Sequence, residues 1–282
     1  MKKLPVIGTS AATTAFCYAQ IDGPGGLHLF VDGNGKITAA NGTMSAPRPN
    51  AFSLRNIEDC PGSTPTCRGS CYVHGLKQHA ADTYTLYEHN AIAIRKILAD
   101  EVLAVSWSFT LADWISENAA GGFRWHVSGD VYSVRYAEFI AAVCAASPDV
   151  AHWIYTRSFG PGIDPAIVDV LAAQSTLFGG NLALNLSADV DNYEHAKATS
   201  VRIGRGVEGA ADGEFARICY MATGNGAVPA DLLPGSVLFP DHPLRGSTAE
   251  GQAWFAALSA DYKSYTCPVD NFGKSEKRRG GP

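Results

Sequence analysis

The sequence predicts an α/β fold, a partial (β/α) barrel of mainly parallel strands, and two observations lead to this prediction. Between residues 123 and 204, strand-like and helix-like segments alternate with short connections, a pattern typical of β-α-β units. The carboxyl ends of parallel strands form the functional site in such folds, so polar residues there are informative. Three successive predicted strands end in such residues: Ser128-Gly129-Asp130, Tyr155-Thr156-Arg157 and Asn185-Leu-Ser187-Ala-Asp189.

Hydrophobic periodicity and the residues that interrupt it define the expected elements. Apolar and aromatic positions recur at helical spacing from about Tyr72 to Asp100, and the pattern continues to Asn118, although Val102–Phe109 also fits a strand. Beyond Gly121-Gly122 we expect strands and helices in alternation. The expected segments are strand 123–130, helix 133–146, strand 150–157, helix 165–174, strand 181–189, helix 195–198 and strand 200–204.

The two ends of the chain differ from this repeat. Residues 1–50 predict a β-rich lead-in packed on the main domain, with a small hairpin over 27–38 whose turn is Asp32-Gly33-Asn34-Gly35. Residues 51–205 hold a cysteine loop and the βα repeat. Residues 206–282 predict a loop-rich C-terminal extension with one strand-like stretch, Ala216–Met221, and a flexible basic tail.

Composition narrows the class of protein. The 282 residues are 46% apolar with a net charge of −5, so the chain can bury a large core and has no strong nucleic-acid signature. No stretch approaches the roughly 20 apolar residues of a membrane helix, and the start of the chain matches a signal peptide only weakly. The seven cysteines do not suggest a disulfide framework in a chain of this size. We therefore expect a cytoplasmic protein with no membrane partner and with free thiols.

Three of these cysteines, Cys60, Cys67 and Cys71, lie within twelve residues rich in Pro, Gly, Ser and Thr. Such turn-forming residues let a loop fold its sulfurs around one centre. Thiolates are soft ligands that select zinc, copper(I) or iron–sulfur clusters. The spacing C-x6-C-x3-C lacks the second Cys pair usual for zinc, so it favours a [4Fe-4S] cluster over zinc. Unligated or redox-active thiols remain a further alternative.

Several short motifs together resemble one family. They are Met44-Ser-Ala-Pro-Arg-Pro-Asn-Ala-Phe-Ser-Leu54, the three cysteines with Tyr72, Phe123–Asp130, Tyr136, Pro148-Asp149 and Tyr155-Thr156-Arg157. This set, over roughly residues 40–200, resembles the actinobacteriophage "gene product 88" family. That family is similar to phage radical-SAM-like iron–sulfur proteins, in which three cysteines leave one iron open to S-adenosylmethionine (SAM). The resemblance implies a cluster and a partial, TIM-barrel-like fold in the host cytoplasm, and no known substrate.

The radical-SAM-like hypothesis assigns cofactor contacts to residues at the predicted strand ends. Tyr72 follows the last loop cysteine, and Ser128-Gly129-Asp130 resembles the strand end that recognises the SAM ammonium group, although Asp130 also suits a helix N-cap. Arg157 could clamp a carboxylate or phosphate, or form a surface ion pair. Asn185, Ser187 and Asp189 alternate on one strand face, so they could contact a ligand inside the barrel, or this polar strand end could cap the following helix.

A fourth cluster ligand would change the function. Cys267, followed by Pro268, is the better candidate because Cys-Pro recurs around iron–sulfur clusters, and Cys219 is the weaker one. With an open iron we expect a radical-SAM-like enzyme acting on an unknown small-molecule or macromolecular substrate. With a fourth protein ligand we expect a non-catalytic phage protein, with an iron–sulfur or zinc centre, that binds a host or phage partner.

Overall fold

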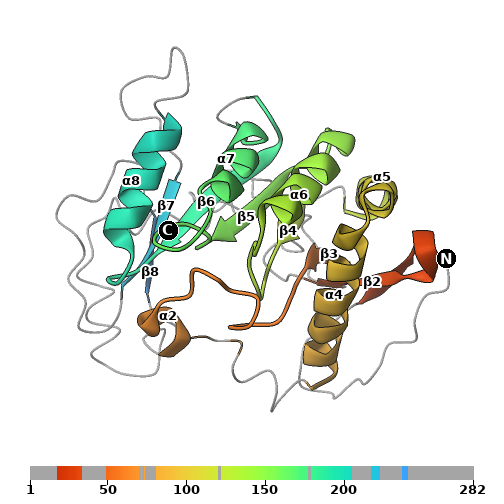
Figure 1. Ribbon diagram of the computed structural model, residues 1–282, viewed down its shortest axis with the longest axis horizontal. Helices are drawn as coiled ribbons and strands as arrows, with labels where there is room; N and C mark the ends of the chain where they lie inside the picture. Colours follow the sequence, from red (N-terminus) through yellow and green to blue (C-terminus); the bar gives the residue numbers. More distant parts are fainter. Residues whose placement is uncertain are drawn as a thin grey trace, which may run out of the picture.

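The computed structural model describes residues 18–33, 49–69, 71, 73, 81–119, 122–176, 179–204, 217–222 and 237–240. Its strands form one sheet in sequential order (Figure 1). They are β1 (Ala19–Asp22), β2 (His28–Gly33), β3 (Pro49–Phe52), β4 (Phe123–Trp125), β5 (His152–Thr156), β6 (Leu182–Ala188), β7 (Arg217–Ala222) and β8 (Val237–Pro240). Strands β1, β2 and β3 pair antiparallel, and every later pair is parallel.

The helices fill the connections between the strands. They are the short 3-10 helix η1 (Pro24–Gly26), α2 (Pro65–Gly69), α4 (Ala81–Ala99), α5 (Glu101–Asn118), α6 (Val134–Ala146), α7 (Ala166–Ala173) and α8 (Tyr193–Gly204). Two predicted helix starts are capped as their sequences suggest. The Asp100 side chain accepts a hydrogen bond from Leu103 N, and that of Ser133 accepts one from Tyr136 N. None of the described helices has the length and apolar content needed to cross a membrane.

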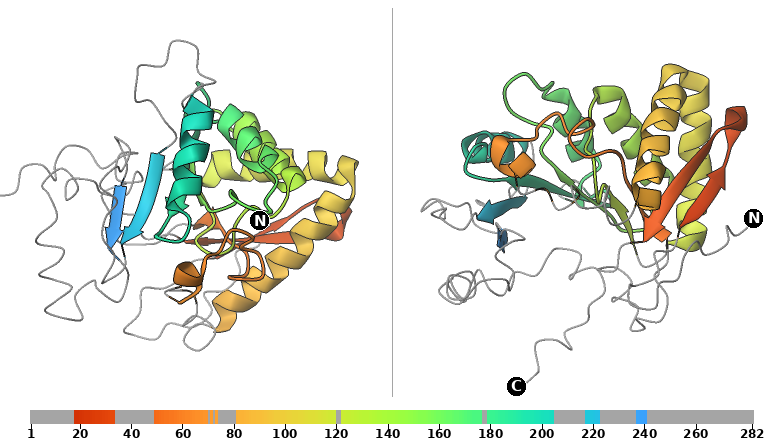
Figure 2. Two further views of the ribbon diagram at one scale, coloured as in Figure 1. Left: turned by 60° about the vertical axis from the view of Figure 1, so that its left-hand side comes forward. Right: turned by 90° about the horizontal axis from the view of Figure 1, so that it is seen from below.

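The predicted α/β class and mainly parallel strands are confirmed, but a barrel is not. Within the described residues the strand order runs from β1 to β8 without returning, so the sheet is open. Right-handed crossovers between neighbouring parallel strands place their helices on the same face. Figures 1 and 2 show α6, α7 and α8 side by side in this way.

The two faces of the sheet differ in polarity because side chains alternate along each strand. The helix-covered face is apolar and fully buried. Its residues include Phe52, Trp125, Ile154, Leu184, Leu186 and Ile218. The opposite face is mixed. Trp153, Asn185 and Cys219 on it are buried, whereas Arg124, Tyr155 and Ser187 are only half-buried, and parallel strands are usually buried on both faces.

Local patterns misled the sequence analysis at three places. Residues 200–204, predicted as a strand, are the last part of α8, where Ser200 and Ile203 continue the buried helical stripe of Tyr193, Ala196 and Thr199. Asp32, assigned to a turn, lies inside β2, and β2 forms its hairpin with β1 instead. Strand β3 was not predicted. Residues 34–38 of the expected hairpin lie outside the described residues. The predicted division of the chain into three regions, with boundaries at residues 50 and 205, stays a prediction.

Asp32 gives a testable pH dependence. Its carboxylate accepts hydrogen bonds from Tyr87 (2.7 Å) and Ser53 (3.3 Å), and burial raises its pKa to about 6. A raised pKa in the folded state favours the protonated form, so this contribution to stability is complete below about pH 4 and is lost as the pH rises through about 6.

We therefore predict that Asp32→Asn, which stays neutral, gains stability relative to the wild type by up to about 3 kcal/mol between pH 4 and pH 8. Urea denaturation of both proteins at the two pH values measures this difference. An equal difference at pH 4 and pH 8 would show that Asp32 has no raised pKa.

Candidate metal centre

The cysteine loop, here residues 53–71, follows β3 and crosses the carboxyl ends of the next strands. Leu54 N donates to Ser128 O (2.8 Å), and Asp130 N donates to Asp59 O (2.7 Å), so two main-chain bonds join this loop to the segment after β4. Gly129 has φ of +79°, and a Cβ there would lie 2.5 Å from the Leu54 side chain. Only glycine permits this approach.

The middle of the loop is equally close to the end of β5. A Cβ on Gly62 would lie 1.6 Å from the carbonyl oxygen of Arg157. Any side chain at this position would therefore push the loop away from the sheet. The Pro-Gly-Ser-Thr composition that predicted a turn also gives the loop the small residue that its packing requires.

Helix α2 carries Cys67 and is fixed to the end of β6 by side chains. Cys67 N donates to the hydroxyl oxygen of Thr64 (3.0 Å), and that hydroxyl donates to Asp189 Oδ2 (2.6 Å). Thr66 N donates to Asp191 Oδ2 (2.9 Å). These bonds place the first turn of α2, and Cys67 with it, over the carboxyl edge of the sheet.

Asp189 is the common acceptor of this region. Its side chain is fully buried, and Arg157 Nη1 donates to the same Oδ2 (2.6 Å) that receives the Thr64 hydroxyl. Asp191 N bonds the other oxygen (2.9 Å). Arg157, predicted as a ligand clamp or a surface ion pair, is therefore engaged in a buried ion pair, and Asp189, predicted on the ligand-facing strand face, holds the loop.

Asp130 is likewise satisfied from within the chain. Its carboxylate accepts hydrogen bonds from Val131 N, the Thr156 hydroxyl and Arg157 N at 2.7–2.8 Å. Burial raises its pKa, and these hydrogen bonds partly offset the rise. The helix N-cap alternative does not apply, because Ser133 caps α6. Asp130 thus joins the ends of β4 and β5, and its contact with a SAM ammonium group stays a prediction.

The three loop cysteines are free thiols, and each is partly accessible. Burial raises the pKa of Cys60, and negative charge on Asp130, Cys67 and Cys71 raises it further. Burial also raises the pKa of Cys67, whereas the positive charge of Arg157 lowers it. Asn56 Nδ2 donates to Cys71 Sγ (3.8 Å). The thiols therefore lie within electrostatic reach of one another.

The same thiols do not form a ready-made site for a single ion. No group of three or more His, Cys, Asp or Glu side chains in the described part of the chain is arranged to hold a metal ion. Electrostatic interactions act over longer distances than metal–ligand bonds do. The thiols can therefore influence the pKa values of one another without being close enough to bind the same ion. Tyr72 and Cys267 lie outside the described residues, and the metal centre stays a prediction.

The remaining predicted residues lie on the polar sheet face. Asn185 Nδ2 donates to the carbonyl oxygens of Ile154 and Ala183, both at 3.1 Å, and its Oδ1 accepts the buried Cys219 thiol at 3.9 Å. Ser187 on β6 is paired in register with Cys219 on β7, and its side chain is half-buried. Asn185 thus has its bonds within the sheet, whereas Ser187 remains accessible to a ligand.

His126 and Ser128 lie in the segment that follows β4. The Ser128 hydroxyl is buried and has no hydrogen-bond partner in the described structure. His126 has φ of +62°, which turns its ring toward α6, where Nε2 bonds the Tyr136 hydroxyl at 2.8 Å. Burial lowers the His126 pKa to about 3, so the ring is neutral. His126 alternates with Arg124 along the sequence, but in the fold it is a hydrogen-bonded core histidine.

A family model described as gene product 88 matches residues 28–280. The chain belongs to the gene product 88 family. The match confirms the phage gene-product family that the motifs indicated and extends beyond residues 40–200, on which that resemblance rested. Similarity to radical-SAM proteins is not among the findings. Neither the curated proteins nor the solved structures gave a match.

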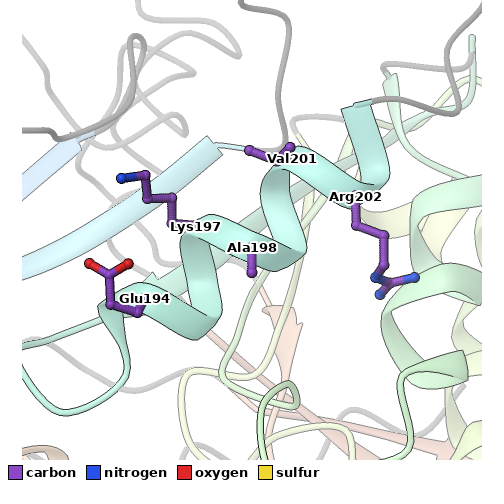
Figure 3. A pocket seen from close by; sticks show the side chains of 5 residues that line it. All are labelled: Glu194, Lys197, Ala198, Val201 and Arg202. Atoms are coloured by element: carbon purple, nitrogen blue, oxygen red, sulfur yellow. The ribbon is translucent and has the colours of Figure 1, made fainter.

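A hollow of about 630 Å³ in this gene product 88 chain is lined by residues of α8, and none of them is a cysteine. Figure 3 shows its lining side chains, all from this one helix: Glu194, Lys197, Ala198, Val201 and Arg202. Arg202 pairs with Asp169 of α7 at the surface. This hollow contains none of the residues that the sequence analysis proposed for the site.

The buried Arg157–Asp189 pair should stabilise the gene product 88 fold. Removing one partner of a buried pair leaves an uncompensated charge, so we expect Asp189→Ala to lower the free energy of unfolding by about 3–5 kcal/mol. Asp169→Ala breaks an exposed pair, where both side chains are about half accessible, and should cost at most about 1 kcal/mol. Urea denaturation compares the two. Equal losses would contradict the anchoring role of Asp189.

Proposed function

We propose that this gene product 88 protein is an iron–sulfur protein in which Cys60, Cys67 and Cys71 hold a [4Fe-4S] cluster. One observation carries the proposal: three free, partly accessible thiols lie on a single loop that is bonded to the carboxyl edge of a parallel sheet. A reducing host cytoplasm would keep these thiols available for iron.

The donor set fits a cluster better than a single zinc ion. Zinc in structural sites takes four ligands at tetrahedral positions around one atom. The described residues offer three thiols without such an arrangement. In a cubane each cysteine binds a different iron, so the ligand sulfurs stand further apart than around one ion. Zinc is therefore the weaker alternative.

The surrounding residues would prepare the thiols for metal. Ligand thiols must lose their protons, and burial opposes this at Cys60 and Cys67. Arg157 favours the Cys67 thiolate, because its positive charge lowers the Cys67 pKa. Asp189 and Thr64 hold the first turn of α2 in place, so this turn would already be ordered before iron binds.

We further propose a radical-SAM-like activity on an unknown substrate. A cluster with an open iron supplies one electron for reductive cleavage of SAM. The half-buried Arg124, Tyr155 and Ser187 on one sheet face support this proposal, because a mostly parallel sheet normally buries the residues on both faces. In a partial barrel that face would line the cavity, and Arg124 and Ser187 on it are partly accessible. The unpartnered Ser128 hydroxyl is available for a cofactor contact.

A non-catalytic function is the second candidate, and one observation favours it. Asp130, the carboxylate predicted to meet the SAM ammonium group, already accepts three hydrogen bonds from its own chain. If Cys219 or Cys267 supplies a fourth ligand, the cluster has no open iron. The centre would then be structural or redox-sensing, and the protein would bind a host or phage partner.

Anaerobic reconstitution with iron and sulfide tests the cluster. We expect about four irons per chain and absorbance near 400 nm, as is general for [4Fe-4S] proteins. Replacing Cys60, Cys67 or Cys71 by Ala should abolish both signals. Cys144→Ala is the matched control, because this cysteine lies on the buried face of α6 in the core and its replacement should leave both signals unchanged. Full iron content in the three loop variants would refute the cluster.

Cys219→Ala and Cys267→Ala separate the two functions. With an open iron, neither substitution should change the iron content, and SAM should alter the electron paramagnetic resonance spectrum of the reduced protein. With a fourth protein ligand, one substitution should lower cluster occupancy or stability. An unchanged spectrum on adding SAM to the wild type would exclude the radical-SAM-like activity while leaving the cluster intact.

A further inference from the structure

Two arginines beside the cysteine loop share one buried carboxylate, a cluster that the sequence analysis did not single out. Arg55 lies four residues before Asp59, and Arg95 comes from α4. The Asp59 side chain is fully buried, whereas the Arg55 and Arg95 side chains are 31% and 39% exposed. Burial tends to raise the Asp59 pKa, but the two arginines hold it below its ordinary value.

The carboxylate of Asp59 has no free hydrogen-bond acceptor position. It accepts hydrogen bonds from Arg55 N, Nε and Nη2, and from Arg95 Nη2, which fills the roughly four acceptor positions of a carboxylate. Each guanidinium carries five N–H donors. Arg55 uses two of these on Asp59, while Arg95 uses one on Asp59 and one on Ala91 O. Several guanidinium donors therefore remain for a ligand. Arg55, Arg95 and Asp59 together carry one positive charge, and the nearby Glu58 carboxylate also acts on Arg55.

A second observation points to a missing partner at the same place. The Arg95 guanidinium lies 4.3 Å from the ring centroid of Tyr132. The Tyr132 hydroxyl is buried and has no hydrogen-bond partner in the described structure. An unpaired buried hydroxyl is costly, so a group that bonds it beside Arg95 would be stabilising.

We propose that Arg55 and Arg95 form a binding site for an oxyanion, the phosphate or carboxylate group of a small-molecule ligand. Guanidinium groups match the planar geometry of these anions and are weakly hydrated, so they bind oxyanions well when partly buried. Asp59 orients both arginines and offsets one of their two positive charges. Tyr132 supplies a stacking surface for Arg95.

The site lies next to the proposed cluster but does not depend on it. Asp59 precedes Cys60 in the chain, and Asn56, which follows Arg55, donates to Cys71 Sγ. A ligand held here would be close to the three thiols. Anion binding requires no metal, so it can be measured on the full-length protein with or without iron, and its failure would leave the cluster proposal untouched.

The test uses inorganic phosphate at constant ionic strength, balanced with chloride. We expect a saturable shift of the Arg95 Nε–Hε signal in nitrogen–proton NMR spectra of the wild type. Calorimetry should show that Arg95→Gln and Arg55→Gln each weaken phosphate binding about tenfold or more, the loss expected for a charged hydrogen bond. Arg202→Gln, which alters a surface arginine on α8, is the control and should bind like the wild type.

Acetate in place of phosphate separates the two ligand classes. Tighter binding of phosphate assigns the site to a phosphate-bearing ligand, and tighter binding of acetate assigns it to a carboxylate. The absence of a saturable Arg95 shift with either anion would overturn the proposal, and this measurement does not depend on the variants folding. Unchanged affinity in a folded Arg95→Gln protein would overturn it as well.

Discussion

The arrangement of the candidate site depends on one buried carboxylate. Asp189, at the end of β6, accepts hydrogen bonds from Arg157 at the end of β5 and from Thr64 at the start of α2. A buried charge is tolerated only when it is paired and hydrogen-bonded, so this geometry leaves little freedom. It determines where α2 begins and therefore where Cys67 stands. Without it, the loop would be held on this side by main-chain bonds and the Asp191 contact.

The ionisable groups at this edge divide into two kinds. Asp59, Asp130 and Asp189 are buried, and each accepts several hydrogen bonds from the chain itself. They hold segments together and have little capacity for a ligand. The loop thiols and the guanidinium groups of Arg55 and Arg95 remain partly accessible. The groups that remain accessible at this edge are therefore thiols and guanidinium groups, whereas the carboxylates are already occupied.

Part of the candidate site could be predicted from the sequence, because the polar residues that follow each strand form a local pattern. Polar residues after three successive strands indicated a shared edge, and the structure brings Asp130, Arg157 and Asp189 together there. Their partners could not be predicted, because Thr64 and Asp189 are 125 residues apart and no local pattern links them. His126 shows the same limit. Alternation placed it with Arg124, but its positive φ turns the ring to Tyr136. The Arg55–Asp59 spacing of four residues was a visible signal that was overlooked.

The sequence by itself determined the α/β class, most of the helices from residue 81 onward and the concentration of cysteines in one loop. These features follow from periodicity and from turn-forming residues, which act over a few positions along the chain. Only the tertiary structure decided that the sheet is open, that β3 belongs to it, and that the strand-end carboxylates are bonded within the chain, Asp189 to the loop and Asp130 to the end of β5. The physical reason is that burial and pairing of charges depend on segments that are distant in sequence and meet only in the folded chain.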